Sequence, residues 1–386
     1  MKSLIDDITP PIALVRVFGY EYACVCTTFK LDETPCAGKS ATASLGNAAL
    51  SHPLRERLPD GSNATNGKNF GSRTRPNMKR VQYDRYGGPT GMYIGESKLP
   101  QLGPKQVRVV VSAAAINPFD WKLRQGAMKL FISRTFPKGM GTDFAGVVAA
   151  VGSDVRDINV GDEVFGTMDF KESGAFAEEV VLDSHLVAKK PASLSFQEAA
   201  CLPIPVMTAW AAIFDKAKTS RGSHLFINGC TGAVGASAVQ LALARGVKVS
   251  GACGTASLET AKAAGLDSVF SYADSRLQAQ KGKFDAVFDT LGTLDVGHGL
   301  SMLKKGGVFV DINPTLRRVT RGMLSRRYKL AFATMGIKRL SAIADLASEG
   351  VLRPTVGLVV PFADAVSAIT AIECGTRIPG KVVLSL

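Results

Sequence analysis

The stretch "FINGCTGAVGASAVQLALARGVKVSGACGTAS", residues 226–257, joins two apolar runs through a turn that contains three glycines. The first run is typical of a buried β-strand, and the run after the turn has helix-forming composition. A further apolar run after the helix, "VKVSGAC" at 247–253, is typical of another strand. The stretch therefore predicts strand, turn, helix and strand, which is the repeating unit of a parallel sheet.

The glycine turn has the spacing GxxGxxG. Backbone without side chains lets a pyrophosphate approach, and the following helix N-terminus offers free N–H groups and a positive dipole. The third glycine lets the helix pack closely on the strand. A purely structural turn is the alternative, but the position between strand and helix favours dinucleotide binding. We expect these turn residues to bind the cofactor: Gly229, Thr231, Gly232, Ala233, Val234 and Gly235.

The end of the second strand predicts which dinucleotide binds. NAD sites place an Asp or Glu there for the ribose 2′-OH, whereas this chain has "GACGTAS" at 251–257. Without a carboxylate to repel a 2′-phosphate, NADPH is favoured. The loop has no arginine, and Lys262, one helical turn further on, would supply the positive charge. The cofactor-binding residues expected here are Cys253, Gly254, Thr255 and Ser257.

Alternating strands and helices continue after residue 223. Strands are predicted at 224–229, 247–253, 268–272, 284–290 and 307–313, with helices such as 233–245 and 257–264 between them. This alternation indicates an α/β fold with a doubly wound parallel sheet.

The preceding region, from 78 to about 200, is rich in strands and indicates a compact, partly open barrel. Strands are predicted at 105–117, 143–152, 161–166 and 176–183. Residues 193–217 change to helical spacing, with a capping box formed by Ser195 and Glu198. The C-terminal stretch returns to strand, helix and strand, and we expect it to rejoin the barrel.

Residues 1–77 are rich in Ser, Thr, Asn, Gly and Ala and lack a sustained period, so we expect a disordered leader outside the fold. The chain has 386 residues and a formal net charge of +13, and no apolar run is long enough to span a membrane. Basic residues concentrate at 315–329, but without interleaved aromatic residues the indication of nucleic-acid binding is weak.

Eight segments in order resemble the medium-chain dehydrogenase/reductase superfamily, in its zinc-free quinone oxidoreductase branch. They are "YDRYGG" (83–88), "AINPFDWKLRQG" (115–126), "GTDFAGVVAAVGSDVRDINVGDEVFG" (141–166), "GAFAEEVV" (174–181), "EAACLPIPVMTAW" (198–210), "GCTGAVG" (229–235), "FDAVFDTLG" (284–292) and "GKVVLSL" (380–386). Within the branch the resemblance extends to chloroplast-envelope quinone oxidoreductase-like proteins, alkenal/enone reductases and mitochondrial reticulon-interacting relatives. It implies a GroES-like β-barrel catalytic domain at 78–205 and 346–386, and a Rossmann NADP-binding domain at 206–345.

Zinc enzymes of this superfamily hold their catalytic metal with a Cys, a Gly-His-Glu and a second Cys. The corresponding positions here are 117–118, 141–143 and 204–205, which read Asn-Pro, Gly-Thr-Asp and Ile-Pro. No metal site is therefore expected, and alcohol oxidation through a Lewis acid is disfavoured. The resemblance instead implies hydride transfer from NADPH to a quinone or to the conjugated C=C bond of an α,β-unsaturated carbonyl compound.

The resemblance also implies roles for single residues. Lys122 would hydrogen-bond the nicotinamide ribose, Asn117 and Thr208 would line the nicotinamide end, and these three are the candidate catalytic residues. The remaining cofactor contacts are assigned to Tyr272, Leu291, Gly292 and Asn313. Three of them have a plainer alternative: Asn117 as a turn residue, Lys122 as a solvated cation and Tyr272 as a strand-end aromatic residue.

Two other functions stay open. One is an enoyl reductase dedicated to a biosynthetic pathway, and the other is a non-catalytic NADPH- or RNA-binding protein that uses 315–329. By analogy we expect a homodimer with small-molecule partners and no nucleic acid. The expected location is the cytoplasm, or an organelle if residues 1–77 are a transit peptide.

Overall fold

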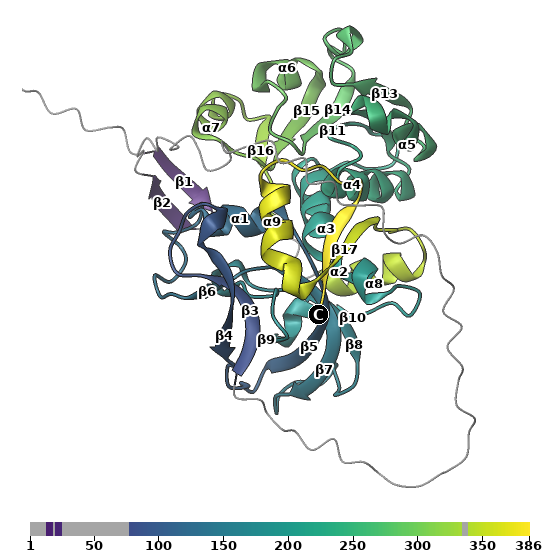
Figure 1. The fold of residues 1–386 in the computed structure, drawn as a ribbon. Coiled ribbons are helices and arrows are strands. Elements are labelled where there is room, and N and C mark those ends of the chain that lie inside the picture. The colour runs from purple at the N-terminus through teal and green to yellow at the C-terminus, as the bar shows by residue number, and fades with distance from the viewer. Residues whose placement is uncertain (1–12, 18–19, 25–76, 334–338) are drawn as a thin grey trace, which may run out of the picture. The chain divides into compact units, whose positions relative to one another are not determined.

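The computed structural model describes residues 13–17, 20–24, 77–333 and 339–386 (Figure 1). The chain divides into two units, Met1–Ser62 and Asn63–Leu386. In the first, β1 (Ala13–Val17) and β2 (Tyr20–Cys24) form an antiparallel hairpin. The rest of the predicted leader lies outside the described residues, so its disorder stays a prediction.

The second unit contains a mainly antiparallel seven-stranded sheet, as the barrel prediction requires. Its strands are β5 (Gln106–Ala115), β7 (Asp143–Val151), β8 (Glu163–Thr167), β9 (Glu179–Asp183), β10 (Val187–Lys189), β17 (Val356–Pro361) and β18 (Lys381–Ser385). Alternate valines of β5 at 107, 109 and 111 are buried, which matches the period of a strand with one covered face. A smaller sheet joins β3 (Asn77–Tyr83), β4 (Met92–Lys98) and β6 (Lys138–Gly139).

A six-stranded parallel sheet, in the order β13-β12-β11-β14-β15-β16, confirms the doubly wound prediction. Its strands are β11 (His224–Asn228), β12 (Lys248–Cys253), β13 (Ser268–Ser271), β14 (Phe284–Asp289), β15 (Leu303–Asp311) and β16 (Tyr328–Leu330). The direction of winding changes between β11 and β14, and ligands of such sheets bind at the carboxyl ends of strands beside this point. The sequence did not predict β16, which is three residues long and lies within the basic segment.

Helices cover the sheets and connect them. They are α1 (Pro118–Arg124), α2 (Phe196–Ala200), α3 (Pro203–Trp210), α4 (Ala233–Ala244), α5 (Leu258–Ala263), α6 (Val296–Ser301), α7 (Leu316–Met323), α8 (Leu340–Ser348) and α9 (Ala365–Glu373). Short helical turns are η1 (Pro89–Gly91), η2 (Phe170–Glu172), η3 (Ser184–Leu186), the π-helical η4 (Ala211–Lys216), η5 (Thr255–Ser257), η6 (Ser275–Leu277) and η8 (Phe362–Asp364). The predicted capping box is present at the start of α2.

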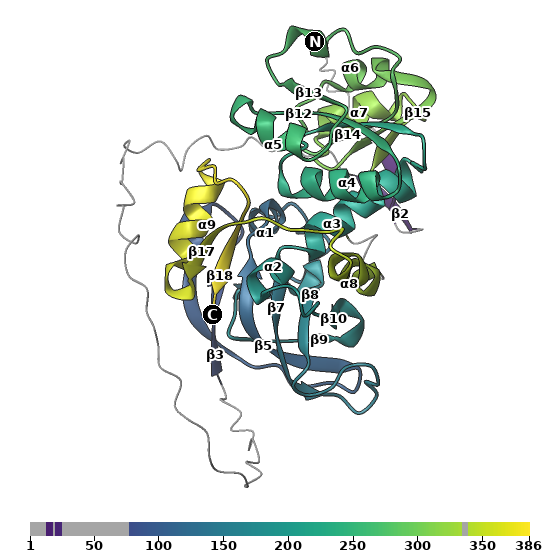
Figure 2. The same ribbon diagram turned by 90° about the vertical axis from the view of Figure 1, so that its right-hand side faces the viewer.

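Within the second unit, the parallel sheet and the antiparallel sheet form two lobes, with α1 and α3 between them (Figure 2). The boundaries predicted at 205/206 and 345/346 fall inside α3 and α8, and these domain limits stay a prediction. β18 pairs with β5, which returns the C-terminus to the antiparallel lobe.

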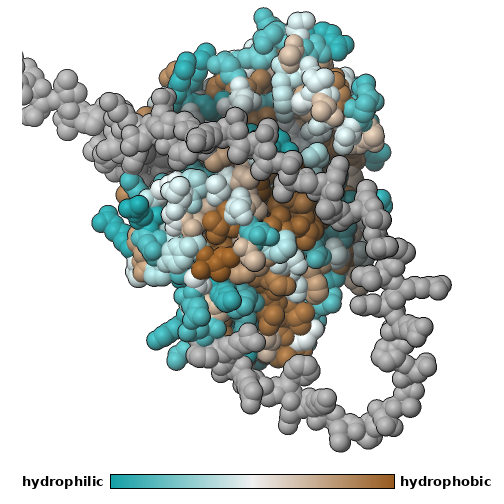
Figure 3. Space-filling view, in the orientation of Figure 1, coloured by the Kyte–Doolittle hydropathy of each residue, from teal (hydrophilic) through white to brown (hydrophobic). Residues whose placement is uncertain are grey.

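The surface in Figure 3 mixes hydrophilic and hydrophobic side chains, with hydrophobic ones gathered along the middle of that face. Among the described residues, no helix combines the length and the apolar character that crossing a membrane requires.

Candidate functional site

The glycine turn joins β11 to α4, as predicted. Gly229 has a φ of +84°, and a Cβ on it would lie 2.3 Å from Thr290 Oγ1. A Cβ on Gly235 would lie 2.0 Å from the carbonyl oxygen of Gly229, so the first and third glycines are required by packing. Gly232 caps α4 without a side-chain hydrogen bond, which leaves the first N–H groups of this helix to an anionic ligand.

The end of β12 lies beside this turn. The N–H groups of Gly229 and Cys230 both donate to the carbonyl oxygen of Ala252, at 2.9 and 3.1 Å. Tyr272, which follows β13 and is 47% exposed, donates its N–H to the carbonyl oxygen of Cys253 at 3.1 Å. The fold therefore brings Tyr272 to the rim of the turn, next to the strand that the sequence assigned to the ribose.

The predicted loop after β12 is open. A Cβ on Gly254 would meet nothing within 4 Å, and Thr255 and Ser257 bound the short turn η5. The nearest carboxylate in sequence, that of Glu259, is exposed and paired with Lys262 at 2.7 Å. Cys253 differs from its neighbours, because its side chain is fully buried and burial raises the pKa of its thiol.

The carboxyl ends of β14 and β15 bring together three further predicted residues. Asp289, the last residue of β14, accepts the N–H groups of Leu291 at 3.1 Å and Gly292 at 3.0 Å. Asp311 ends β15 and accepts the N–H of Asn313 at 2.8 Å. Both aspartates are fully buried, so they fix the backbone of the loops that carry the predicted contacts.

Lys122 reaches this rim from the other lobe. Its Nζ donates to Asn313 Oδ1 at 2.5 Å, and Asn313 Nδ2 donates to the carbonyl oxygen of Thr290 at 2.7 Å. Burial lowers the pKa of Lys122, and the charge of Asp311 opposes that shift. Two residues that were predicted separately, 191 positions apart, thus meet across the lobes.

Asn117 lies deeper, at the N-terminus of α1, and only 3% of it is exposed. Its Nδ2 donates to Asp143 Oδ2 at 2.9 Å, and its Oδ1 accepts from Lys381 Nζ at 2.5 Å. Asp120 accepts the backbone N–H of Asn117 at 2.7 Å and the hydroxyl of Thr142 at 2.8 Å. Both ends of the Asn117 amide are therefore held by protein groups.

The two carboxyl groups of this cluster are strongly perturbed. Burial raises the pKa of Asp143 to about 7 and that of Asp120 to about 6, and the charge of Lys381 opposes both shifts. Thr208, the third candidate catalytic residue, lies buried on α3. The same helix donates the N–H of Ile204 to Asp143 at 3.1 Å, so α3 and α1 meet at this carboxyl group.

Family models match both lobes. Residues 103–192 match the alcohol dehydrogenase GroES-like domain, and residues 264–384 match the zinc-binding dehydrogenase model. A 2-methylene-furan-3-one reductase from Solanum lycopersicum is 31% identical over 318 residues, which cover 80% of this chain and 79% of that protein. The chain belongs to the medium-chain dehydrogenase/reductase family.

Two further family members extend the comparison. An NADPH-dependent alkenal/one oxidoreductase from Arabidopsis thaliana, described as chloroplastic, is 35% identical over 61% of this chain and 62% of its own length. The solved quinone oxidoreductase from Coxiella burnetii superposes with a TM-score of 0.72 at 31% identity, over 80% of this chain and 99% of that structure. The predicted resemblance and fold class are confirmed.

The description of one matching family model, zinc-binding dehydrogenase, implies a metal, but the groups at the corresponding positions do not suit one. They offer the amide of Asn117, the hydroxyl of Thr142 and the carboxyl of Asp143, already bonded to protein partners. The Lys381 ammonium in the same cluster opposes a second cation. Within 77–333 and 339–386 no three His, Cys, Asp or Glu residues form a group that could hold a metal.

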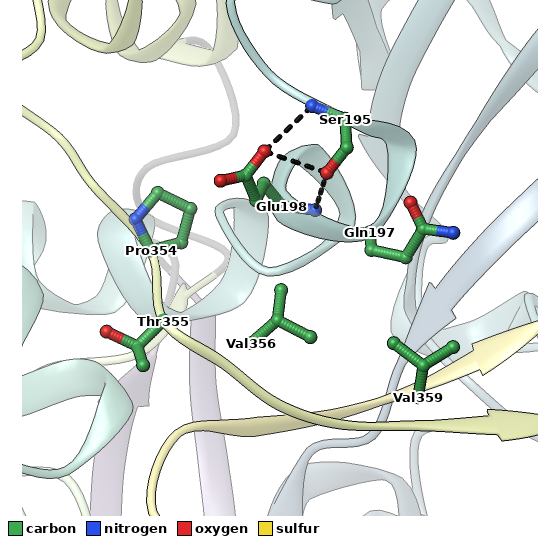
Figure 4. A pocket seen from close by; sticks show the side chains of 7 residues that line it. All are labelled: Ser195, Gln197, Glu198, Pro354, Thr355, Val356 and Val359. Carbon is green, nitrogen blue, oxygen red and sulfur yellow. Dashed lines mark hydrogen bonds between the residues drawn. The ribbon is translucent and has the colours of Figure 1, made fainter. Parts of the chain in front are cut away.

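A surface hollow of about 560 Å³ lies elsewhere, between α2 and β17 (Figure 4). Its lining residues are Ser195, Gln197, Glu198, Pro354, Thr355, Val356 and Val359. Ser195 and Glu198 are bonded to each other in the capping box, and none of the predicted site residues borders the hollow. It is therefore separate from the candidate site.

The sequence did not single out four residues that organise the site: Lys381, Asp289, Asp311 and Arg318, whose guanidinium donates to both aspartates at 2.7 Å. The two aspartates did carry a signal in the sequence. Each lies near the end of a predicted parallel strand, at the edge of the sheet where ligands bind. Lys381 carried no such signal, because its partner Asn117 lies 264 residues away in sequence. Arg318 carried none either, because it belongs to the basic segment 315–329, for which a different role was expected.

Proposed function

We propose that this chain is an NADPH-dependent oxidoreductase that transfers hydride to a quinone or to the conjugated C=C bond of an α,β-unsaturated carbonyl compound. One observation carries the proposal: the glycine turn, the Asp289 and Asp311 loops and Lys122 converge on one rim, while the metal positions hold a hydrogen-bonded amide, hydroxyl and carboxyl cluster. The printed names of the relatives, a furanone reductase, an alkenal/one oxidoreductase and a quinone oxidoreductase, support the substrate class.

Each part of the rim has a role in this reaction. The N–H groups at the start of α4 would bind the pyrophosphate. Lys122 and Asn313 would orient the nicotinamide ribose, and Leu291 and Gly292 would flank the ring. NADPH, when bound, supplies the hydride.

A conjugated acceptor needs no metal to become electrophilic. Addition of hydride to the β-carbon moves the π pair of the C=C bond between the α-carbon and the carbonyl carbon, and the π pair of the carbonyl moves to its oxygen to give an enolate. A proton from water at the α-carbon then completes the saturated carbonyl compound. A quinone likewise takes up one hydride and one proton to give the hydroquinone. The protein's task is to orient donor and acceptor and to exclude bulk water.

NADPH is proposed over NADH because the 251–257 loop has no carboxylate, and Glu259 is occupied by Lys262. A carboxylate in that loop would repel the 2′-phosphate. The Arabidopsis relative's printed name is consistent with this preference.

The test follows NADPH and NADH oxidation by the full chain against quinones, alkenals and enoyl thioesters, with a secondary alcohol and NADP⁺ as the contrast. We expect turnover with quinones or alkenals that a metal chelator does not reduce. Activity only with enoyl thioesters would favour the dedicated enoyl reductase. Intact NADPH binding with no turnover would overturn the general reductase.

Two finer points are also proposals. We propose a homodimer that forms along β16, the last strand at one edge of the described parallel sheet, and a monomeric mass by light scattering would contradict it.

We propose a cytoplasmic location. The chloroplastic Arabidopsis relative makes an organelle the alternative, and imaging of the full chain fused to a fluorescent protein would separate the two.

A further inference from the structure

Arg318 belongs to the basic segment 315–329 but points into the protein. It lies on the first turn of α7, its side chain is 12% exposed, and its N–H donates to the Thr315 hydroxyl at 3.3 Å. Its Nε donates to Asp311 Oδ2 and its Nη2 to Asp289 Oδ2, both at 2.7 Å. One guanidinium therefore joins the carboxyl ends of β14 and β15.

The third nitrogen of the guanidinium holds the loop after β14. Nη1 donates to the carbonyl oxygens of Gly292 at 2.8 Å and Leu294 at 2.7 Å. Four acceptors thus surround one planar fork of donors. A lysine ammonium is a single point with three donors, and it cannot reach all four acceptors in this geometry.

The opposite oxygens of the two aspartates hold the proposed cofactor rim. Asp289 Oδ1 accepts the N–H groups of Leu291 and Gly292, as well as Asn228 Nδ2 at 2.8 Å. Asn228 immediately precedes the glycine turn. Through Asp289, Arg318 is therefore connected to the ends of β11 and β14.

The connection through Asp311 leads to the other lobe. Asp311 Oδ1 accepts the N–H of Asn313, whose side chain accepts from Lys122. Both aspartates are fully buried, and Arg318 is the cation that bridges them. Without it, two buried negative charges would repel each other and release both loops.

We propose that Arg318 is a positioning residue for hydride transfer: it sets the loops at 291–294 and 312–313 that would flank the nicotinamide ring. This inference rests on the proposed function. Arg318 acts through the aspartates and would not touch the cofactor, so its loss should reduce turnover by misplacing the ring.

The other arginines in the basic segment provide a matched comparison. Arg321, one turn later on α7, pairs with Asp295 at 2.9 Å, and about half of each side chain is exposed. Arg327 donates to the carbonyl oxygens of Gly307 and Lys304. Arg321 therefore controls for the loss of a charge in the same helix.

The experiment compares Arg318→Lys, Arg318→Gln and the control Arg321→Gln in the full chain. We expect Arg318→Lys to fold with a Tm lowered by a few degrees, because a lysine leaves some of the four acceptors without a donor. It should lose at least tenfold in kcat and change KM for the acceptor less than threefold. The primary isotope effect with NADPH deuterated at C4 should rise, because misplacement slows the hydride step itself. Arg321→Gln should stay within twofold of wild type.

Three outcomes would overturn the inference. Arg318→Lys could keep kcat and the isotope effect within twofold of wild type, or Arg321→Gln could lose as much as Arg318→Lys. Failure of Arg318→Lys to fold would assign the residue to stability instead of positioning, whatever Arg318→Gln does.

A failure of the proposed reductase function can be distinguished from a failure of the Arg318 inference. If the wild-type chain binds NADPH but reduces no acceptor, the fluorescence of bound NADPH decides the inference. Arg318→Lys should then shift the emission of the bound nicotinamide and Arg321→Gln should not. An unshifted emission in Arg318→Lys would reject the positioning role independently of catalysis.

Discussion

Lys122 is a predicted site residue that bonds across the two lobes, and its role in cofactor binding stays a prediction. It extends from α1 to Asn313 on the facing lobe, where the ribose of the cofactor is proposed to lie. Lys122→Ala removes a charge-assisted hydrogen bond, which is worth about 1.5–3 kcal/mol, so KM for NADPH should rise roughly 10- to 100-fold. Steady-state kinetics with varied NADPH measure this effect. Lys105→Ala, at an exposed position, should leave KM unchanged, and the same result for Lys122→Ala would remove it from the site.

The carboxyl group of Asp143 should make the free energy of unfolding depend on pH. Its pKa is raised by burial to about 7 in the folded chain, above the usual 3.8, so the folded state binds its proton more tightly than the unfolded state does. The resulting stabilisation is fully present below pH 3.8 and is lost as the pH rises to about 7. Asp120, whose pKa is raised to about 6, contributes in the same direction between pH 3.8 and 6.

Asp143→Asn should therefore flatten this dependence. Between pH 5 and 7.5, wild type should lose more free energy of unfolding than the variant, by about 1–3 kcal/mol. Urea unfolding at the two pH values measures the difference. Asp157→Asn, at an exposed position, should change it little, and an equal loss in Asp143→Asn and wild type would refute the assignment.

Sequence reasoning named residues that would touch the cofactor, which stays a prediction, but it missed the buried residues that hold their loops in place. The glycine turn and the acid-free loop carry their signals within a few positions. Lys381 bonds to Asn117 from 264 residues away, and this contact depends on the register of β18 against β5. Arg318 was read only as part of a charged segment, because charge along a sequence does not show which side chain turns inward.

Among the elements, the β11–α4 turn leaves no room for added volume at its third glycine. A Cβ at Gly235 would come within 2.0 Å of a backbone carbonyl that cannot rotate away. Gly235→Ala should therefore displace the start of α4 and raise the Kd for NADPH at least about tenfold. Fluorescence titration measures Kd, and thermal unfolding shows whether the chain still folds. Gly87→Ala, which would meet nothing within 4 Å, is the control, and a Kd within twofold of wild type for Gly235→Ala would contradict the close packing.

Whole strands were predicted from the sequence when they were long and had a regular apolar pattern. β11, β12 and β14 are apolar runs beside turns, and they were placed to within one or two residues. β16 was missed because its three residues, Tyr-Lys-Leu, follow a cluster of arginines and have no pattern of their own. Its place at the sheet edge comes from pairing with β15, which is a tertiary contact.

At the scale of the molecule, the charge of the chain has a consequence for cofactor choice. The formal net charge is +13, yet two arginines of the basic segment, Arg318 and Arg327, donate to acceptors of the parallel lobe. These internal contacts disfavour the RNA-binding alternative for 315–329. The remaining positive field still attracts anions over about 10 Å at about 0.1 M salt.

This field should contribute to the preference for NADPH over NADH, because the 2′-phosphate adds roughly two negative charges. Salt screens that contribution, so the ratio of KM for NADH to KM for NADPH should fall about three- to tenfold between 50 and 500 mM NaCl. Steady-state kinetics with an uncharged quinone measure both constants. KM for the quinone should stay constant, which separates screening from a general effect of salt on the fold. If the two KM values rose in parallel, the preference would come from short-range contacts at 251–257 alone, and the net charge would have no part in it.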